Sequence, residues 1–255
     1  MSAAKPLISI IIPTLNEQSG IEKTIKNIPE SDIKNTSGFD VEIIVVDGQS
    51  TDSTREVATK LGAQVIIEHR KGYGRACKSG FAAARGEILV TLDADSTYPT
   101  ECIAEYVQVL QGKKLDFITV NRFRYMDKGA MSLTRRLGNK ILTSALRLLY
   151  SVDIKDSQSG MWIMRRAFIS QIELNSDDMS MSEEIKIIAF KFFRSKELDG
   201  RYSARCGTAK LKVFHDGFNN LKYLFNYRKK LQSSVRKPVT ATKANEISLK
   251  RSKYP

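Results

Sequence analysis

The 255-residue sequence has few cysteines and no long apolar run. Its cysteines, Cys77, Cys102 and Cys206, are odd in number and lack C-x-x-C spacing, which excludes a disulfide framework and a cysteine zinc site. No segment approaches the roughly 20 apolar residues needed to cross a bilayer. Residues 6–13 are apolar, but the run is only as long as a strand and no small-residue cleavage site follows it. We therefore expect a cytoplasmic protein without a signal peptide, soluble or bound peripherally to a membrane.

Positive charge is concentrated in two segments. The formal net charge is +13, and residues 217–255 hold ten Lys/Arg against one acidic residue. Residues 121–150 hold seven Lys/Arg against one acidic residue, which leaves the remaining chain nearly neutral. This pattern favours local contact with phosphate groups or an anionic surface, although a solvated basic tail would give a similar composition.

The first 120 residues alternate between short apolar runs and helical patterns. We expect Pro13 to end the first strand, because proline cannot donate to a strand ladder, and Asn16 to cap the following helix. We expect residues 30–38 to form a loop. The predicted strands cover 7–12, 41–46, 63–67, 88–92 and 116–120, and the predicted helices include 53–61 and an alanine-rich helix ending at Arg85. This alternation predicts an α/β fold with a doubly wound, mostly parallel sheet of Rossmann-like type.

Polar residues follow three of the predicted strands. Right-handed crossovers place the carboxyl ends of parallel strands at one edge of the sheet, where open α/β sheets bind their ligands. Asp93 and Asp95 can converge on one cation, because residues i and i+2 of an extended backbone point to the same side. Alone, this Asp-x-Asp could equally be an ordinary acidic turn. The other strand ends carry Thr14, Asn16 and Glu17 and the cluster from Asp47 to Asp52.

A basic glycine loop, residues 70–75, precedes the alanine-rich helix. A helix N-terminus beside such a loop is a natural phosphate site, and Lys71, Arg75 and Lys78 add positive charge. The loop is not a Walker A motif, and no third glycine completes a dinucleotide fingerprint, which argues against kinases and dehydrogenases. Together with acidic residues that could hold base and ribose, the loop predicts a pocket for a nucleotide diphosphate.

The motifs at residues 13–17, 47–52, 70–75 and 93–95, in this order and spacing, resemble those of family 2 glycosyltransferases with the GT-A fold. Further segments resemble polyprenyl-phosphate sugar synthases, of which dolichyl-phosphate mannosyl- and glucosyltransferases are the nearest members. These segments are Asp156–Gly160 with Arg166, Ser182–Glu184, and Tyr202–Leu211, where Thr208 and Ala209 replace the usual serine position. The resemblance implies a GT-A catalytic domain over residues 1–215 with flanking amphipathic helices. An amphipathic C-terminal helix over 216–232 and a basic, disordered tail over 233–255 would follow.

The resemblance implies inverting transfer of a sugar from a nucleotide-diphosphate sugar to a polyprenyl or dolichyl phosphate, with Mg²⁺ or Mn²⁺ as cofactor. UDP-glucose or a related UDP-sugar is favoured as the donor over GDP-mannose, because Gly72–Arg75 and Gln158–Trp162 resemble glucosyl-type relatives. Magnesium needs only one or two carboxylates besides phosphate oxygens, and Asp93 and Asp95 would supply them. A phosphate acceptor has its second pKa at about 6, so it needs cations more than a general base.

The expected site residues follow from these motifs. The catalytic set is Asp95, Arg122, Arg136 and Arg205. The substrate-binding set is Pro13, Thr14, Asn16, Glu17, Asp47, Gln49, Ser50, Asp52, Lys71, Gly74, Arg75, Lys78, Asp93, Ala94, Ser159 and Lys210. Trp162 would line the acceptor site or belong to the core, and His215 would approach the metal or be an ordinary polar residue.

Residues 132–150 predict a basic amphipathic helix. Such a helix can lie in a membrane interface with its cations at lipid phosphates, or it can cover the sheet with a solvated charged face. The family resemblance favours peripheral contact with an anionic membrane. The apolar stripe consists of Leu133, Leu137, Ile141, Ala145, Leu148 and Leu149, beside Arg135, Arg136, Lys140 and Arg147.

Three other functions stay open. A glycosyltransferase acting on a glycan hydroxyl would need Glu183 or Glu184 as a general base, whereas the same pair could simply be the acidic first turn of a helix. A basic nucleic-acid-binding protein would leave the strand-end carboxylates unexplained, so we expect no nucleic-acid partner. A pseudoenzyme that only binds is disfavoured, because both expected metal carboxylates are present.

Overall fold

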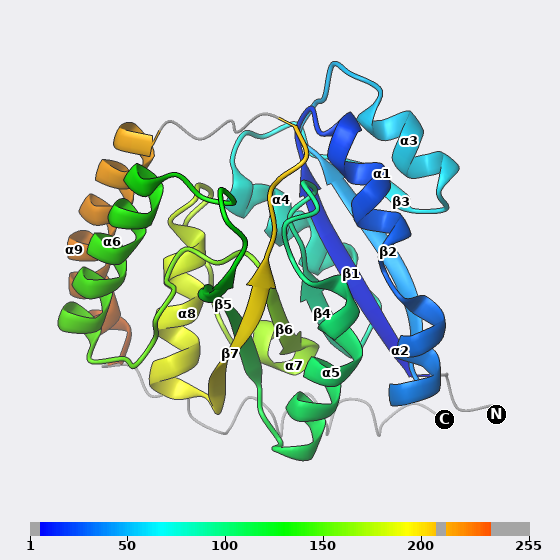
Figure 1. Cartoon of the computed structure of the whole chain (residues 1–255). Coiled ribbons are helices and arrows are strands. Elements are labelled where there is room, and N and C mark those ends of the chain that lie inside the picture. The colour runs from blue at the N-terminus through cyan, green and yellow to red at the C-terminus, as the bar shows by residue number, and fades with distance from the viewer. Residues whose placement is uncertain (1–5, 208–212, 236–255) are drawn as a thin grey trace.

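The computed structural model describes residues 6–207 and 213–235. Within them, seven strands form one sheet in the order β3-β2-β1-β4-β6-β5-β7 (Figure 1). β6 runs antiparallel to β4 and β5, and the other neighbours are parallel. The expected mostly parallel α/β sheet is confirmed. The strands are β1 (Leu7–Thr14), β2 (Asp40–Asp47), β3 (Gln64–Ile67), β4 (Ile88–Thr91), β5 (Phe117–Met126), β6 (Trp162–Arg165) and β7 (Ser195–Tyr202).

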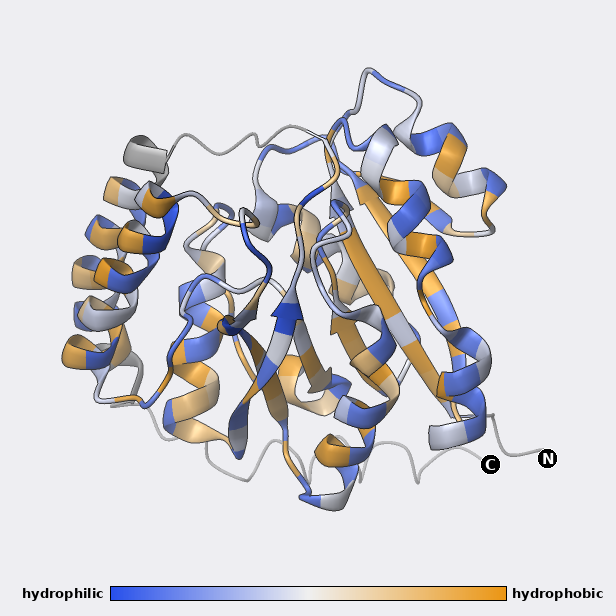
Figure 2. Ribbon diagram, viewed as in Figure 1, coloured by the Kyte–Doolittle hydropathy of each residue, from blue (hydrophilic) through white to orange (hydrophobic). Residues whose placement is uncertain are grey.

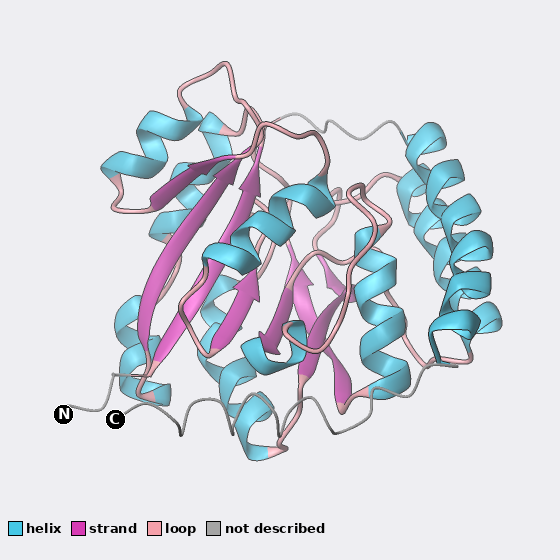
Figure 3. Cartoon of the chain, turned by 180° about the vertical axis from the view of Figure 1, so that it is seen from behind, coloured by secondary structure: helices cyan, strands magenta, loops and turns pink. Residues whose placement is uncertain are grey.

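Helices cover both faces of the sheet (Figures 1 and 3). One core cluster joins one face to α1 (Gln18–Lys26), α2 (Glu30–Ser37), α3 (Thr54–Lys60) and α5 (Ile103–Gly112), which follows the short 3-10 helix η1 (Thr100–Cys102). A second cluster joins the opposite face to α4 (Tyr73–Ala83), α7 (Arg166–Ile169) and α8 (Met181–Phe192). The mostly apolar strand β1, largely orange in Figure 2, lies between these layers, as expected for a strand buried on both faces.

Two long helices form a separate layer beside α8. These are α6 (Leu133–Tyr150) and α9 (Val213–Val235), which pack against each other and against α8 through a third apolar cluster. The helix predicted over 132–150 therefore forms, but its partners are helices and it does not cover the sheet. α9 extends beyond the expected limits of 216 and 232 at both ends. Most of the tail expected over 233–255 lies outside the described residues.

The prediction that Pro13 ends the first strand was wrong, since β1 continues to Thr14. The carbonyl of Ile11 accepts the N–H of Leu92, so residues 11 and 13 direct their polar backbone groups toward β4. The paired register of β1 and β4 ends at Ile11 and Thr91. The N–H that Pro13 lacks would therefore face a side where no strand pairs with it, and the proline is tolerated.

Two local predictions in the first β-α unit were also wrong. Residues 30–37 form α2, which the sequence pattern concealed because Ile33 is its single buried residue; Gly38, with φ 77°, ends it. The residue that precedes α1 is Glu17, and Asn16 has φ 50°. The side chain of Asn16 does not cap the helix, because it accepts the backbone N–H of Thr51 at 2.7 Å.

Candidate active site

The turn that follows β4 carries Asp93 and Asp95 to the carboxyl edge of the sheet. Asp95 is buried, and its Oδ1 accepts the hydroxyl of Thr97 at 2.7 Å. α1 begins directly against this turn, because a Cβ added to Gly20 would lie only 2.5 Å from the carbonyl oxygen of Ala94. The close approach fixes the backbone between the two carboxylates, and only glycine fits on the helix side.

The electrostatics of this turn suit a cation. Desolvation by burial and the like charge of Asp95 raise the pKa of Asp93 to about 7, while Arg122 and Arg205 oppose the shift. Tyr73 donates a long hydrogen bond to Asp93 Oδ1 at 3.4 Å. Two like charges held this close repel, and a divalent ion between them would relieve the repulsion. Among the described residues, no group of three or more His, Cys, Asp or Glu could hold a metal by itself. A metal here would need further oxygens from a ligand, which is how Mg²⁺ binds substrate phosphates.

Arg205, just beyond β7, joins this turn to the first motif of the chain. Its Nη2 donates to Glu17 Oε1 at 3.0 Å and lies 3.5 Å from Asp95 Oδ2. The backbone N–H of Cys206 also donates to the carbonyl of Asp95 at 2.9 Å. Arg205 Nε is buried and has no hydrogen-bond partner among the described residues. The guanidinium therefore keeps a donor for an anionic ligand beside the carboxylate pair.

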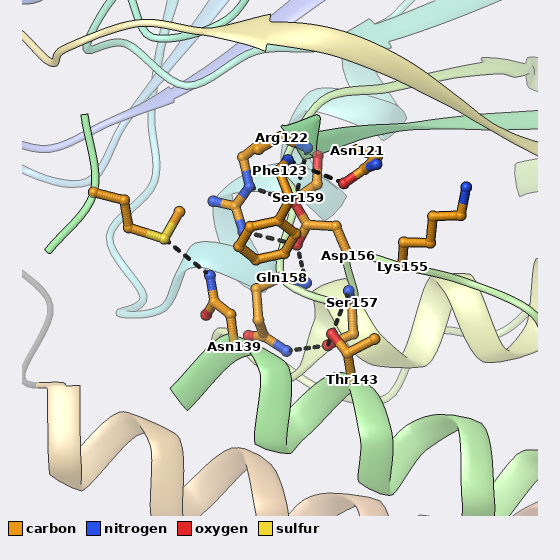
Figure 4. A network of polar contacts seen from close by, with 12 residues as sticks. Asn121, Arg122, Phe123, Asn139, Thr143, Lys155, Asp156, Ser157, Gln158 and Ser159 are labelled. Atoms are coloured by element: carbon orange, nitrogen blue, oxygen red, sulfur yellow. Dashed lines mark hydrogen bonds and ion pairs between the residues drawn. The ribbon is translucent and has the colours of Figure 1, made fainter. Parts of the chain in front are cut away.

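Arg122 is buried in β5, and its side chain is paired with Asp156. Its Nε and Nη2 donate to the two carboxylate oxygens at 2.7 and 2.9 Å (Figure 4). Its guanidinium also lies 5.2 Å from the ring centre of Tyr202. This forked geometry holds Arg122 in one position. Arg136, by contrast, is exposed in the first turn of α6, and its side chain forms no hydrogen bond or ion pair with any described residue. Of the three expected arginines, Arg205 therefore lies beside the carboxylates. Arg122 is paired with Asp156, and Arg136 takes no part in this network.

The two N-terminal motifs meet at the ends of β1 and β2. Asn16 N–H donates to Ser50 Oγ at 2.8 Å, and the N–H of Gln18 donates to Asp52 Oδ2 at 3.2 Å. Asp47 is fully buried: its Oδ1 accepts the N–H of Ser50 at 2.9 Å, and its Oδ2 has no hydrogen-bond partner among the described residues. An unsatisfied buried carboxylate oxygen is costly, and it would readily accept an N–H of a nucleotide base. Of the other residues expected here, Pro13 and Thr14 lie buried in β1, while Gln49 donates from Nε2 to His69 O at 2.6 Å.

The basic glycine loop differs from the expected phosphate cradle. A Cβ on Gly72 would lie 2.2 Å from Asp177 O, and one on Gly74 would lie 2.7 Å from Met181 Cβ. These glycines therefore make room for residues 176–181, which cover the start of α4. Arg75 is paired with Glu68 at 3.5 Å, and Lys78 is paired with Asp177 at 2.5 Å. Of the three cations expected to bind phosphate, Lys71 is the exposed one, and it has no ion pair within the described chain.

The acidic pair at the start of α8 is buried. Glu184 accepts the N–H groups of Asn175 and Ser176 at 2.9 to 3.1 Å, which identifies it as a structural residue of the preceding loop. Glu183 is 0% exposed and accepts Gln158 Nε2 at 2.7 Å. Burial raises the pKa of Glu183 to about 8. A protonated and enclosed carboxyl is poorly suited to act as the base for a glycan hydroxyl.

The remaining expected residues have mixed outcomes. Ser159 is buried, and Tyr98 donates to its hydroxyl at 3.4 Å. Trp162 is 0% exposed and belongs to the core. Lys210 and the side chain of His215 lie outside the described residues. Reasoning from the sequence missed Tyr73 and Lys186; a lysine within the apolar pattern of α8 was the available signal for the second.

Comparisons with known proteins identify the family and the fold of the chain. The family model for glycosyl transferase family 2 matches residues 9–173. The chain is 31% identical over 222 residues to the low-salt glycan biosynthesis hexosyltransferase Agl6 of Haloferax volcanii, covering 86% of this chain and 53% of that protein. It is 29% identical to the dolichyl-phosphate hexose transferase of the same organism, over 82% of this chain and 89% of that one. It is also 30% identical to the dolichol-phosphate mannosyltransferase of Pyrococcus furiosus, over 80% and 59%. The chain thus spans little more than half the length of two of these relatives.

A similar solved structure is glucosyl-3-phosphoglycerate synthase of Mycobacterium tuberculosis, with a TM-score of 0.69 and 21% identity over 88% of this chain and 80% of that one. The likeness establishes a shared GT-A fold. The family match covers more than half of the chain and leads to one conclusion: this chain belongs to glycosyl transferase family 2.

Proposed function

We propose that the enzyme transfers a hexose, with inversion, from a nucleotide-diphosphate sugar to a polyprenyl phosphate at the cytoplasmic face of a membrane. The names of two relatives, a dolichyl-phosphate hexose transferase and a dolichol-phosphate mannosyltransferase, support this acceptor. A UDP-hexose is the favoured donor, and the neighbouring synthase was solved with UDP-glucose and Mn²⁺. The observation that carries the proposal is the set of side chains at the site. Arg205, whose buried Nε has no partner among the described residues, lies beside the carboxylates, whereas Glu183 and Glu184 of α8 are buried.

The division of work among the residues follows from their positions. Asp47 Oδ2 would accept an N–H of the base, and Asp93 and Asp95 would hold the metal. Bound there, Mg²⁺ or Mn²⁺ supplies positive charge that neutralises the departing diphosphate. Arg205 would hold an anionic oxygen through its free Nε, with Glu17 fixing the direction of its guanidinium. Arg122 contributes a fixed positive charge, which already acts on Asp93.

No proton needs to be removed from the acceptor. A phosphate monoester has its second pKa at about 6, so its attacking oxygen is already ionised at neutral pH. The task of the protein is to hold two anionic groups in line despite their repulsion, which arginines and a metal accomplish by charge and by orientation. A hydroxyl acceptor would instead require a base with access to the substrate.

The surface formed by α6 and α9 supports action at a membrane. Four apolar side chains of α6 point to solvent, spaced so that they lie on one helical face, with exposed fractions of 82% for Leu133, 62% for Leu137, 53% for Ile141 and 84% for Leu148. Phe218 and Phe225 are exposed on the adjacent α9. Both helices show alternating apolar and polar colour in Figure 2. Exposed cations accompany them: Arg136, Lys140, Arg147, Lys222, Arg228 and Lys229.

Apolar side chains flanked by cations are suited to the boundary between anionic headgroups and acyl chains. The apolar stripe predicted for α6 mixes two faces of the helix. In the structure, Ala145 and Leu149 pack inward with α9, whereas the four residues above remain outside. No helix of the described chain is long and apolar enough to span a bilayer. We propose that this α6–α9 surface binds peripherally to an anionic membrane.

The direct test is a transfer assay with purified enzyme. UDP-glucose and GDP-mannose, each with Mg²⁺ or Mn²⁺, are offered with a short polyprenyl phosphate and, separately, with oligosaccharides. We expect sugar on the polyprenyl phosphate, dependence on the metal, and faster reaction with the UDP-sugar. Transfer to oligosaccharides alone would replace the proposed acceptor with a hydroxyl.

A further inference from the structure

Lys186 is a buried lysine in the middle of α8 that has no part in the chemistry proposed above. Its side chain is 0% exposed. Its Nζ donates to the carbonyl oxygens of Ser157 at 2.8 Å and Ser159 at 2.6 Å, and to Ser182 Oγ at 3.0 Å. These three acceptors use every N–H of an ammonium group. Such a group is costly to bury, so its position calls for an explanation.

Two of these bonds hold one loop, residues 156–160, against α8, and the third joins Lys186 to Ser182 on the same helix. Ser182 Oγ adds a bond to Ser159 O at 3.1 Å, and Trp162 Nε1 donates to the same oxygen at 2.9 Å. Gln158 Nε2 donates to Glu183 Oε1 at 2.7 Å. Four side chains therefore converge on this short loop, and both Lys186 and Ser182 reach the carbonyls of Ser157 and Ser159.

The 156–160 loop reaches the candidate site at both of its ends. At one end, Asp156 accepts hydrogen bonds from Nε and Nη2 of Arg122. At the other end, Gly160 lies so close to the carboxylate of Asp93 that a Cβ added to it would be 2.9 Å from Oδ1. Gly160 is itself held, because its N–H donates to Tyr98 Oη at 2.7 Å and its carbonyl accepts the hydroxyl of Thr91 at 2.7 Å.

We propose that Lys186 is a positioning residue for the metal-binding carboxylate: by holding the carbonyls of Ser157 and Ser159 it keeps Gly160 against Asp93 and keeps Asp156 on Arg122. The inference rests on the proposed function, because it takes Asp93 as a metal ligand. Groups that orient a ligand without touching the metal are worth about 10- to 100-fold in metal affinity or activity. Burial lowers the pKa of Lys186 to about 7, and the nearby Asp156 opposes this shift.

The test measures Mn²⁺ binding directly, by the electron paramagnetic resonance signal of free Mn²⁺, in the presence of UDP. Lys186→Met keeps the length of the side chain and removes the ammonium. We expect its dissociation constant for Mn²⁺ to rise about 10- to 100-fold, with a comparable fall in kcat. Lys191→Met is the matched control, since Lys191 lies on the same helix and bonds to Tyr150 O at 3.2 Å, away from the loop. It should bind Mn²⁺ as the wild type does.

Each outcome decides the inference. A folded Lys186→Met protein, judged by circular dichroism, that binds Mn²⁺ with wild-type affinity overturns it, even if its melting temperature is lower. Should Lys186→Met not fold, Ser182→Ala removes the bonds of the Ser182 hydroxyl to the same loop at smaller cost; weaker Mn²⁺ binding supports the inference and unchanged binding overturns it. Wild-type protein that binds no Mn²⁺ with UDP would refute the metal site itself, and with it this role of Lys186.

Discussion

Arg205 and Glu17 form a 3.0 Å ion pair across 188 positions of the chain. The pair lies at the carboxyl edge of the sheet and places the guanidinium 3.5 Å from Asp95. A segment that follows the last strand is thereby joined to the end of the first and to the turn after the fourth. The pair fixes the direction of a cation whose Nε has no partner among the described residues.

Replacing Arg205 should therefore affect turnover more than folding. We expect Arg205→Ala to lower kcat by about 10²- to 10³-fold, the usual cost of removing one oriented donor to a developing charge. Arg201→Ala is the control, because Arg201 is exposed and pairs with Asp127 outside the site. Steady-state kinetics of both variants provide the check, and equal losses would assign Arg205 a purely structural role.

Asp93→Asn should be inactive and yet more stable than the wild type when metal is absent. The pKa of Asp93 is raised from 3.8 to about 7, so the folded state binds a proton that the unfolded state has lost. The carboxylate therefore reduces stability as the pH rises from about 4 to 7, and asparagine removes this cost. Thermal unfolding at about pH 8 with a chelator should give a higher midpoint for Asp93→Asn. A lower midpoint would mean that the ionised carboxylate of Asp93 does not destabilise the folded protein.

Glu183→Gln should retain substantial turnover with a phosphate acceptor. The amide can still accept from Gln158, and the proposed reaction needs no base. The comparison is kcat for Glu183→Gln against Arg205→Ala in the same assay. Complete loss of turnover in Glu183→Gln, with turnover kept in Arg205→Ala, would identify a hydroxyl acceptor.

The same variant should change the pH dependence of stability. The pKa of Glu183 is raised from 4.5 to about 8 by burial, so the native state stays protonated where the unfolded state is ionised. This carboxyl makes the free energy of unfolding fall as the pH rises from 4.5 to about 8. Urea unfolding across this range should show the decline in the wild type and a flatter profile in Glu183→Gln. Parallel profiles would show that Glu183 ionises normally.

Membrane contact should depend on the exposed leucines of α6. We expect Leu137→Gln combined with Leu148→Gln to weaken sedimentation with vesicles containing phosphatidylserine, because each buried leucine contributes about 1.5–3 kcal/mol. The control is Leu146→Met, a conservative change at a buried position of the same helix. Cosedimentation that is unaffected by the double change, or equal on neutral vesicles, would exclude this surface as an anionic-membrane site.

Regular patterns predicted the strands from β1 to β5, whereas β6 and β7 were not expected. Apolar runs such as 88–92 indicated the strands, and the polar strand ends indicated the carboxyl edge where Asp93 and Asp95 lie. Arg205 was expected there only from the family resemblance. The paired β1 and β2 motifs also come together as expected. These features follow from local sequence combined with the handedness of crossovers.

The parts that were missed depend on contacts between distant residues. Gly72 and Gly74 read as a phosphate loop, but their lack of side chains accommodates residues 176–181. Lys78 reads as a free cation, but Asp177 neutralises it. The outward face of α6 could not be assigned before its packing on α8 and α9 was known. In each case the residue type permits two roles, and the partner decides between them.

The pairing of β5 with β7 also has a consequence for synthesis of the chain. Asn121 and Asp199, which face each other in this pair, are 78 positions apart, and Arg205 emerges after both. A nascent chain that stops before β7 holds the Asp93–Asp95 turn without its cation and without the strand that carries Arg205 to it. The candidate site is therefore incomplete until β7 and Arg205 have been made, and a shorter chain is expected to be unable to bind a nucleotide-sugar productively.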